Sequence, residues 1–521
     1  MNEFVPRTQS IADVYPAETT SDSGLDIDQV ARWTVFLKRF KEIYDDIPEI
    51  VARSPGRVNI IGEHIDYSLY DVLPAALRVD VLIGVRAYRI PGPDGIVKLA
   101  NFNATKFPGQ DFSVPGGCDV EFDINKHEWA NYFKAGMRIA LHFLRAKSSG
   151  NPSPPLRMKV LVDGNVPPGG GVSSSAALIC ASALATVKTH GYNLSKQELL
   201  DLSLVSERSV GVYSGGMDQS ASVFCRSGYL LYTQFYPTYC IANLPIPKSK
   251  PEITFLVAQS FVISNKADTA PTRYNLRVAE CTLAALVLAK LHKVTLSPDT
   301  SPLNYCLRSF HQELMQQEGR LNDPLEYQLD SIISGATKLL KQDKGYTREE
   351  IAKILEISVP DLESTHLSAF PVKADRFYLR QRALHCFKEA RRVIDFTACL
   401  TKSDHIDNHR LKYLGQLMNE SQESCRTLYD CSCPEINEMC KIARDAGALG
   451  SRLTGAGWGG CTVNMIPQTK VESVISALKK KYYEKRSELT EEQMKVAMVI
   501  SKPSTGAFVI HGSAITDILS P

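Results

Sequence analysis

Residues 167–178, PPGGGVSSSAAL, consist mostly of glycines and residues with small side chains, and they constrain the fold of this chain more than any other stretch. Before it, residues 158–162 read MKVLV, which predicts a strand. After it, the sequence from Ser173 onward is rich in Ala, Leu, Ile and Cys and has no helix breaker, which predicts a helix. The order strand, glycine loop and helix therefore requires mixed α and β structure.

A loop without side chains suits an anionic ligand. Its amides can converge on phosphate oxygens, and the helix behind it adds unpaired N–H groups and the positive end of its dipole. The hydroxyls that follow can cap the helix, bind phosphate or ligate Mg²⁺. The residues concerned are Gly169, Gly170, Gly171, Ser173, Ser174 and Ser175. The alternative is a tight turn with a serine cap. Neither the GKS or GKT ending of a P-loop nor a spaced GxGxxG is present, so an ATP site here belongs to another class of nucleotide-binding fold.

Charge and composition favour a small-molecule or protein partner. Lys and Arg number 59 against 57 Asp and Glu, which leaves no basic surface for nucleic acid or a membrane. The longest bland apolar run, residues 176–187, is too short to span a bilayer. The 13 Cys are scattered, and the cluster Cys425, Cys431, Cys433 and Cys440 has neither CxxC spacing nor a nearby His. We therefore expect a cytoplasmic protein in a reducing compartment, with no zinc site.

The length of 521 residues predicts two domains. Residues 1–24 are polar and rich in Ser, Thr and Pro, so we expect a flexible arm there. Domains are then expected at 25–255 and 256–521. Apolar spacing predicts a helix over 27–44, and β-branched residues predict a strand over 79–85.

The second half reads as more helical and charged. We expect helices between 295 and 375, one of them beginning at a capping box formed by Thr347 and Glu350. A second glycine cluster, SRLTGAGWGGCTVNMIP, occupies residues 451–467 and leads into a predicted strand.

Polar side chains are unusually dense in residues 53–77, RSPGRVNIIGEHIDYSLYDVLPAAL. Several donors and acceptors of both signs suit a polyhydroxylated ligand, because every buried hydroxyl must be paired. The polar residues are Arg57, Asn59, Glu63, His64 and Asp66. Taken singly, each acid could be a solvated loop residue, and the histidine could be structural.

Residues 56–67, GRVNIIGEHIDY, resemble the galactokinase signature GRxNxIGEHxDY at every fixed position. The loop GNVPPGGGVSSSAAL resembles the nucleotide motif of the GHMP kinase superfamily, and SRLTGAGWGGC resembles its C-terminal motif. With EWANYFKAG and GGMDQSAS, the resemblance to galactokinases of the fungal type spans roughly residues 30–510. It implies the α+β, two-domain GHMP kinase fold, with a mixed α/β N-terminal domain, an α+β C-terminal domain and the active site in the cleft between them.

The resemblance also implies a reaction, in which the γ-phosphoryl of Mg-ATP passes to the C1 hydroxyl of α-D-galactose, giving galactose 1-phosphate and ADP in galactose catabolism. Asp218, in the MDQ segment, takes the place of the residue facing that hydroxyl and can accept its proton. Arg57 is its cationic partner and steadies the transition-state charge.

Further roles follow by resemblance only. The sugar hydroxyls fall to Glu63, His64, Asp66 and Tyr274, of which the tyrosine could instead be core packing. Nucleotide contacts fall to Gly169, Gly170, Gly171, Ser173, Ser174, Ser175, Asn265 and Lys266. Mg²⁺ falls to Ser174 and Glu207, although Glu207 could be a surface acid paired with Arg208 or Arg277. Backbone approach to the nucleotide loop falls to Gly455, Ala456, Gly457, Gly459 and Gly460.

Departures from the family pattern are confined to flanking positions. Asn165, Pro168 and Val172 replace an Asp and two Leu, which should change packing only modestly. Some fungal relatives are catalytically idle galactose and ATP sensors that bind a transcriptional repressor, and these lack a Ser-Ala pair in the serine run. In this chain Ser174, Ser175 and Ala176 are all present, which favours catalysis. The open alternatives are such a sensor or an N-acetylgalactosamine kinase. We expect a monomer.

Overall fold

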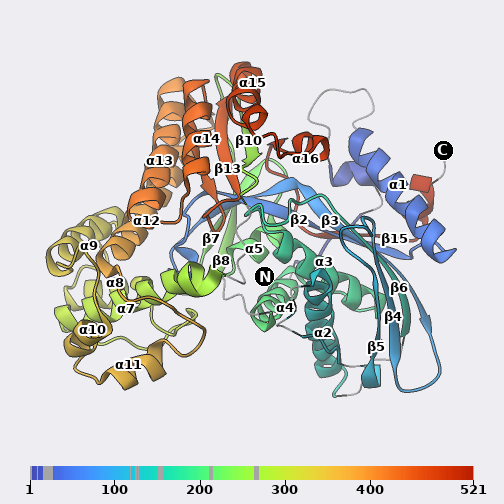
Figure 1. Ribbon diagram of the computed structural model, residues 1–521, viewed down its shortest axis with the longest axis horizontal. Helices are drawn as coiled ribbons and strands as arrows, with labels where there is room; N and C mark the ends of the chain where they lie inside the picture. The colour runs from blue at the N-terminus through green and yellow to red at the C-terminus, as the bar shows by residue number, and fades with distance from the viewer. Residues whose placement is uncertain are drawn as a thin grey trace.

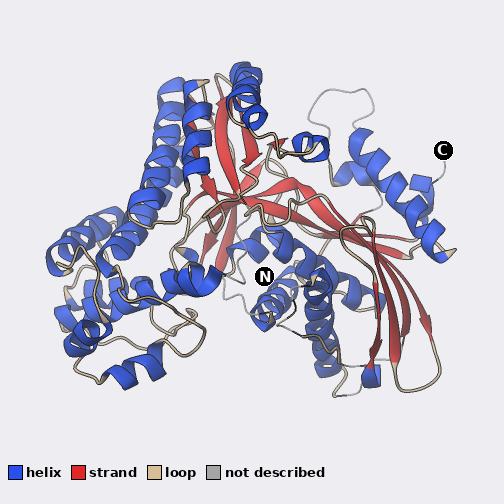
Figure 2. Cartoon of the chain, viewed as in Figure 1, coloured by secondary structure: helices blue, strands red, loops and turns tan. Residues whose placement is uncertain are grey.

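The computed structural model describes residues 3–8, 10–15, 27–117, 119–123, 126, 128–150, 156–210, 215–262 and 269–519. Among these residues there are two main sheets and two small two-stranded ones. Figures 1 and 2 show the larger sheet on one side, the smaller main sheet beside it, and a group of helices at the far side of the smaller sheet.

The larger sheet has seven strands in the order β1-β15-β2-β3-β6-β4-β5. Its strands are β1 (Arg7–Thr8), β2 (Ile50–Ile61), β3 (Leu73–Arg89), β4 (Gly95–Asn101), β5 (Gln110–Val114), β6 (Leu156–Gly164) and β15 (Phe508–His511). Its helices are α1 (Ile27–Tyr44), α2 (Trp129–Lys147), α3 (Ser174–Thr189), α4 (Lys196–Ser209), α5 (Met217–Phe224) and α17 (Ser513–Leu519). Both faces of the sheet are covered, so successive strand residues enter different cores. Leu82 packs with Trp33 of α1, whereas its neighbour Ile83 packs in the cluster that includes α2 and α3.

The smaller main sheet has the order β12-β13-β10-β14. Its strands are β10 (Ile253–Gln259), β12 (Gly450–Thr454), β13 (Cys461–Pro467) and β14 (Met498–Ser501). The helices of this part are α7 (Tyr274–His292), α8 (Leu307–Gln317), α9 (Leu325–Leu339), α10 (Arg348–Leu355), α11 (Val359–His366), α12 (Leu379–Thr401), α13 (Asn408–Thr427), α14 (Pro434–Asp445), α15 (Val471–Lys481) and α16 (Glu491–Lys495). The short strands are β7 (Tyr229–Gln234), β8 (Cys240–Pro245), β9 (Lys248–Ser249) and β11 (His405–Ile406).

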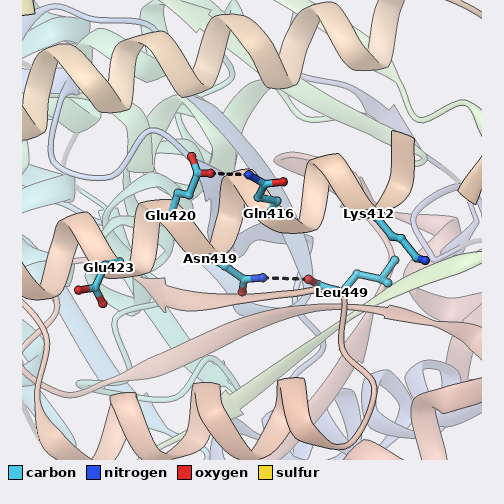
Figure 3. Close-up of a pocket in the computed structure, with 6 residues that line it drawn as sticks. All are labelled: Lys412, Gln416, Asn419, Glu420, Glu423 and Leu449. Atoms are coloured by element: carbon cyan, nitrogen blue, oxygen red, sulfur yellow. Dashed lines mark hydrogen bonds between the residues drawn. The ribbon is translucent and has the colours of Figure 1, made fainter. Parts of the chain in front are cut away.

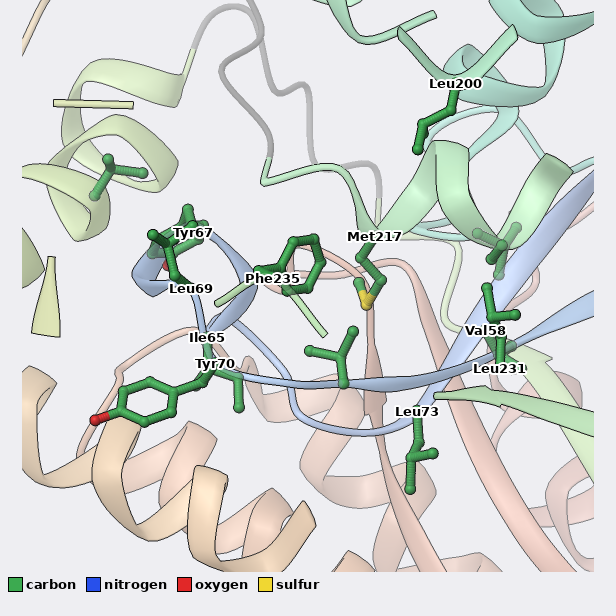
Figure 4. Packing of buried hydrophobic residues seen from close by; sticks show 14 of the residues in the cluster. Val58, Ile65, Tyr67, Leu69, Tyr70, Leu73, Leu200, Met217, Leu231 and Phe235 are labelled. Carbon is green, nitrogen blue, oxygen red and sulfur yellow. The ribbon is translucent and has the colours of Figure 1, made fainter. Parts of the chain in front are cut away.

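One apolar cluster joins the two parts. It includes residues of β2 and β3, the connection between them, and the helices α7 and α12. Figure 4 shows Ile65, Tyr67 and Leu69 of that connection near Met217 of α5 and Phe235. The polar segment between β2 and β3 is therefore anchored by its own isoleucine and aromatic side chains.

The local predictions agree with the structure. The helix over 27–44 is α1, and the strands over 79–85 and 158–162 lie within β3 and β6. The capping box begins α10, since Thr347 accepts the amide of Glu350 and the Glu350 side chain accepts the amide of Thr347.

The prediction of a flexible arm over residues 1–24 is wrong for residues 3–8 and 10–15. β1 pairs with β15, and Tyr15 is 1% exposed with its hydroxyl donating to Asp80. Residues 16–24 lie outside the described residues. The apolar residues Val5, Ile11 and Val14 pack against the sheet despite the polar composition around them.

The predicted domain boundary at 255 falls inside β10, so it cuts a strand. The second half also returns to the first sheet, because β15 pairs with β2 between Phe508–Arg53 and His511–Ile50. Sequence composition carries no signal for this return. In the parts of the chain that the structure describes, no helix has the length and apolar content needed to cross a membrane.

Candidate active site

A buried ion pair joins the two segments that the sequence singled out. Arg57 lies in β2 beside a register shift, and Asp218 lies in the first turn of α5 after Gly216, whose φ is +108°. The Arg57 Nε donates to Asp218 Oδ1 at 2.7 Å, and its Nη1 donates to the Gly171 carbonyl oxygen at 2.7 Å. The side chains are 3% and 7% exposed. One guanidinium thus fixes a carboxylate next to the glycine loop.

Asp66 approaches the same helix. A Cβ at Gly215 would lie 2.5 Å from Asp66 Oδ2, so only glycine leaves room for this carboxylate. Burial, aided by the charge of Asp218, raises the pKa of Asp66 to about 6, although the amides of Tyr67 and Met217 oppose the shift.

Glu63 is held by the smaller sheet. Its Oε2 accepts from Arg452 Nη2 at 3.0 Å and from the Gly455 amide at 3.1 Å. Burial raises the pKa of Glu63 to about 7, while the charges of Arg452 and Arg57 oppose this. No sequence pattern singles out Arg452, which lies 389 positions from Glu63.

The backbone of His64 is left-handed, with φ +61°. Its Nε2 lies 3.0 Å from the Ala456 carbonyl oxygen, and its Nδ1 lies 2.9 Å from the Tyr67 hydroxyl. A carbonyl only accepts, so in the neutral ring the proton is on Nε2 and the Tyr67 hydroxyl donates to Nδ1. Tyr274, the first residue of α7, stands 5.6 Å from the His64 ring centroid.

Tyr274 is half-buried. Burial raises its pKa well above the ordinary value, and the charges of Asp66 and Asp218 add to the shift. The tyrosine therefore shares the electrostatic environment of both carboxylates, in addition to packing against aromatic rings.

The glycine loop has left-handed backbone at Gly169, Gly171 and Ser173, with φ of +70°, +71° and +61°. Ser173 is the N-cap residue of α3, yet its hydroxyl does not cap the helix. The Ser173 Oγ is buried and has no hydrogen-bond partner. A buried hydroxyl without a partner is costly, so this atom marks a place where a polar ligand would be satisfied.

Glu207 is 1% exposed in α4. The Ser175 Oγ donates to its Oε1 at 3.3 Å, and the Gln219 Nε2 donates to its Oε2. The alternative of a surface acid is wrong, because Glu207 is buried, and Arg277 pairs instead with Glu280 and Asp430.

This oxygen-rich group of donors suits Mg²⁺. Ser174 begins α3, and the hydroxyl of its neighbour Ser175 donates to the Glu207 carboxylate. Asn265 and Lys266 lie outside the described residues.

The second glycine cluster meets the first, as predicted. A Cβ at Gly455 would lie 2.0 Å from the Gly171 carbonyl oxygen, and one at Gly460 would lie 2.9 Å from that of Gly170. Glycine at these positions lets the two loops touch through their backbones. Gly457 and Gly459 contact Cys431 and Val262 in the same way.

A shallow pocket of about 430 Å³ lies elsewhere, against α13. Figure 3 shows polar side chains of that helix along it, with Asn419 donating to the Leu449 carbonyl oxygen. None of the predicted site residues lines it.

Asn59 was not selected as a ligand, although both polar atoms of its buried side chain have no hydrogen-bond partner.

Comparison with known proteins places this geometry in a class. The model for the GHMP kinases N terminal domain matches residues 131–226, the GHMP kinases C terminal model matches 403–484, and the galactokinase galactose-binding signature matches 38–87. The fold is therefore that of a GHMP kinase, and the galactose-binding signature makes the protein an ATP-dependent sugar kinase within that class.

Individual relatives narrow the class. A galactokinase of Saccharomyces cerevisiae is 40% identical over 494 residues, covering 90% of this chain and 93% of the relative. One of Dictyostelium discoideum is 38% identical, covering 87% and 88%. The solved structure of Lactococcus lactis galactokinase complexed with galactose has a TM-score of 0.62 at 21% identity, covering 91% of this chain and 98% of that one. The chain belongs to the galactokinase family.

Proposed function

We propose that this protein transfers the γ-phosphoryl of ATP to the C1 hydroxyl of α-D-galactose. A bond forms between the C1 oxygen and the γ-phosphorus, the bond from that phosphorus to the β-phosphate oxygen breaks, and the hydroxyl proton leaves. The products are galactose 1-phosphate and ADP. The buried Arg57–Asp218 pair, tied to the glycine loop through the Gly171 carbonyl, is the observation that carries this proposal.

Asp218 would receive the hydroxyl proton. Its carboxylate keeps hydrogen-bond contact with Arg57, which stabilises the ionised form before the reaction and the charge on the moving phosphoryl group during it. Because Arg57 also holds the loop carbonyl of Gly171, base and nucleotide loop keep a fixed separation, which is what phosphoryl transfer needs from a protein.

The sugar would be bound by Glu63, His64, Asp66 and Tyr274. Two carboxylates supply acceptors, and the two aromatic rings supply an apolar face. Several such groups with different roles reject a sugar that lacks one hydroxyl, since the unmatched buried group would lose its partner.

The nucleotide would lie on the glycine loop. Its phosphates would take the amides of Gly169, Gly170 and Gly171 and the hydroxyls of Ser173, Ser174 and Ser175, with Asn265 and Lys266 as further contacts. The unpartnered Ser173 Oγ supports this placement. Ser174 and Glu207 would hold Mg²⁺, which when bound neutralises phosphate charge.

The test compares Asp218→Asn with wild type in an assay of ADP release with Mg-ATP and either galactose or N-acetylgalactosamine. We expect wild type to use galactose, and the variant to lose about 10²- to 10⁴-fold in kcat while both ligands still bind by calorimetry. The exposed acid of α4, changed as Asp201→Asn, is the matched control and should keep wild-type turnover. Wild-type binding of galactose and ATP without ADP release would contradict the enzyme.

The curated relatives carry the name galactokinase, so the enzyme is favoured over a sensor and over an N-acetylgalactosamine kinase. A repressor-type protein partner and a monomeric state stay predictions. A cytoplasmic location is also a prediction.

A further inference from the structure

Side chains of α12 hold the backbone of the loop at residues 62–64. This loop carries two of the proposed sugar ligands and has left-handed backbone at Gly62 and His64, with φ of +100° and +61°. A left-handed histidine is unfavourable on its own, so contacts from outside the loop must maintain it.

Glu389 supplies the first of these contacts. Its Oε1 accepts the amide of Gly62 at 2.9 Å, the amide of Glu63 at 3.2 Å and the Ser421 hydroxyl at 2.7 Å. Its Oε2 accepts from Arg392 Nε at 2.8 Å. The carboxylate is fully buried, and Arg392 with other nearby cations lowers its pKa to about 2. A permanent negative charge therefore faces two consecutive loop amides.

His385, one turn earlier on α12, supplies the second. Its Nε2 lies 3.0 Å from the Glu63 carbonyl oxygen, and its Nδ1 lies 2.8 Å from the Ser424 hydroxyl. Burial lowers the pKa of His385 to about 4, so the ring is neutral at neutral pH. The carbonyl can only accept, which puts the proton on Nε2 and makes Ser424 the donor to Nδ1.

We propose that Glu389 and His385 are positioning residues for the sugar, because between them they bind both amides and the carbonyl that fix the loop bearing Glu63 and His64. This inference rests on the proposed function, since it assigns those two side chains to galactose. Neither positioning residue touches the glycine loop in any contact described, so its effect should fall on the sugar and not on ATP.

Contacts with the Glu63 side chain hold the same loop from a second direction. Arg452 and the Gly455 amide hold the Glu63 carboxylate, while α12 holds the Glu63 backbone. Releasing the backbone would leave the carboxylate attached and let the loop rotate around it. The left-handed backbone of His64 would lose the contacts from α12 that maintain the preceding residues.

The experiment measures KM for galactose and for ATP separately, along with galactose affinity by calorimetry, which needs no turnover. The variants are Glu389→Gln, which keeps shape but loses charge, and the pair His385→Phe and His385→Gln, of which only the glutamine can still donate to the Glu63 carbonyl. Asp395→Asn is the matched control, an acid of the same helix that pairs with Arg391 instead of the loop.

We expect Glu389→Gln and His385→Phe to weaken galactose binding about tenfold or more, with the KM for ATP unchanged within about twofold. His385→Gln should recover most of the loss, and Asp395→Asn should behave as wild type. Equal effects on both substrates, or lower thermal stability with unchanged sugar affinity, would overturn the proposal. If Glu389→Gln does not fold, the histidine pair decides alone. Wild type that binds galactose without releasing ADP would contradict the proposed function and leave the binding comparison intact.

Discussion

The pKa values of the buried carboxyl groups at the proposed site depend on burial and on the charges of neighbouring carboxylates. The charge of Asp218 acts on both Glu63 and Asp66, and among the described residues Arg57 and Arg452 bring positive charge to them. The pKa values of Glu63 and Asp66 are raised because burial outweighs these cations. At such a site, a proton and a sugar hydroxyl compete for the same carboxylate oxygen.

Asp66→Asn should reveal this through stability. The pKa of Asp66 is about 6 in the folded protein against an ordinary 3.8, so between these values only the unfolded chain ionises. Wild-type stability therefore falls as pH rises through this window, and the variant lacks that fall. We expect the free energy of unfolding of the variant, relative to wild type, to rise by on the order of 3 kcal/mol from about pH 4 to about pH 7.

Urea unfolding at four pH values in that range measures the effect. The exposed Asp404, changed to Asn, is the control and should give a difference that does not depend on pH. A flat difference for Asp66→Asn as well would show that this carboxyl has the same pKa in the folded protein as in the unfolded chain.

Two glycine-rich turns, one before α3 and one between β12 and β13, contact each other directly. Their backbones touch at Gly171 and Gly455 more closely than any side chain allows. This contact joins the larger sheet to the smaller one directly at the proposed nucleotide loop.

Gly455→Ala should break that contact. The new Cβ would lie 2.0 Å from the Gly171 carbonyl oxygen, and φ is +85°. Gly191 has φ +81° with nothing within 4 Å, so Gly191→Ala carries the backbone strain alone and should cost about 1 kcal/mol. We expect Gly455→Ala to lower ATP affinity at least about tenfold in calorimetry, with Gly191→Ala unchanged. Equal behaviour of the two variants would show that the loops separate without cost.

The sequence predicts features that depend on neighbouring residues, but not those that depend on contacts between residues far apart along the chain. The helix α1, the strand β6 and the capping box of α10 follow from local spacing, and the signature around Glu63 follows from resemblance. Arg452, Glu389 and Gln219 were not selected, because their roles come from contacts that the fold brings together. No periodicity at Glu389 distinguishes it from any other helical acid.

Across the protein, residues near both ends share one sheet. β15 lies between β1 and β2, and Tyr15 donates to Asp80 in a buried network with Arg53 and Arg32. Arg53 in turn donates to the carbonyl oxygens of Thr505 and Gly506. The larger sheet is therefore closed by segments from far apart in the sequence.

Tyr15→Phe tests this closure. It removes a buried hydroxyl donor to a carboxylate and leaves the ring, so we expect a loss of about 1–3 kcal/mol in the free energy of unfolding. Tyr327→Phe, at a tyrosine that is 63% exposed, should change it by less than about 0.5 kcal/mol. Urea denaturation of both variants gives the comparison, and equal stability would show that the Tyr15 hydroxyl does not stabilise the contact with Asp80.

The position of β15 has a consequence for biosynthesis. On the ribosome, β2 emerges early, yet the strand that pairs with its outer edge cannot do so until residues 508–511 have been translated. Throughout elongation the nascent chain carries an unpaired edge, the kind of surface that recruits chaperones or invites aggregation. The larger sheet can therefore be completed only after β15 has left the ribosome, and translation stalled before β15 should yield a product that proteases remove.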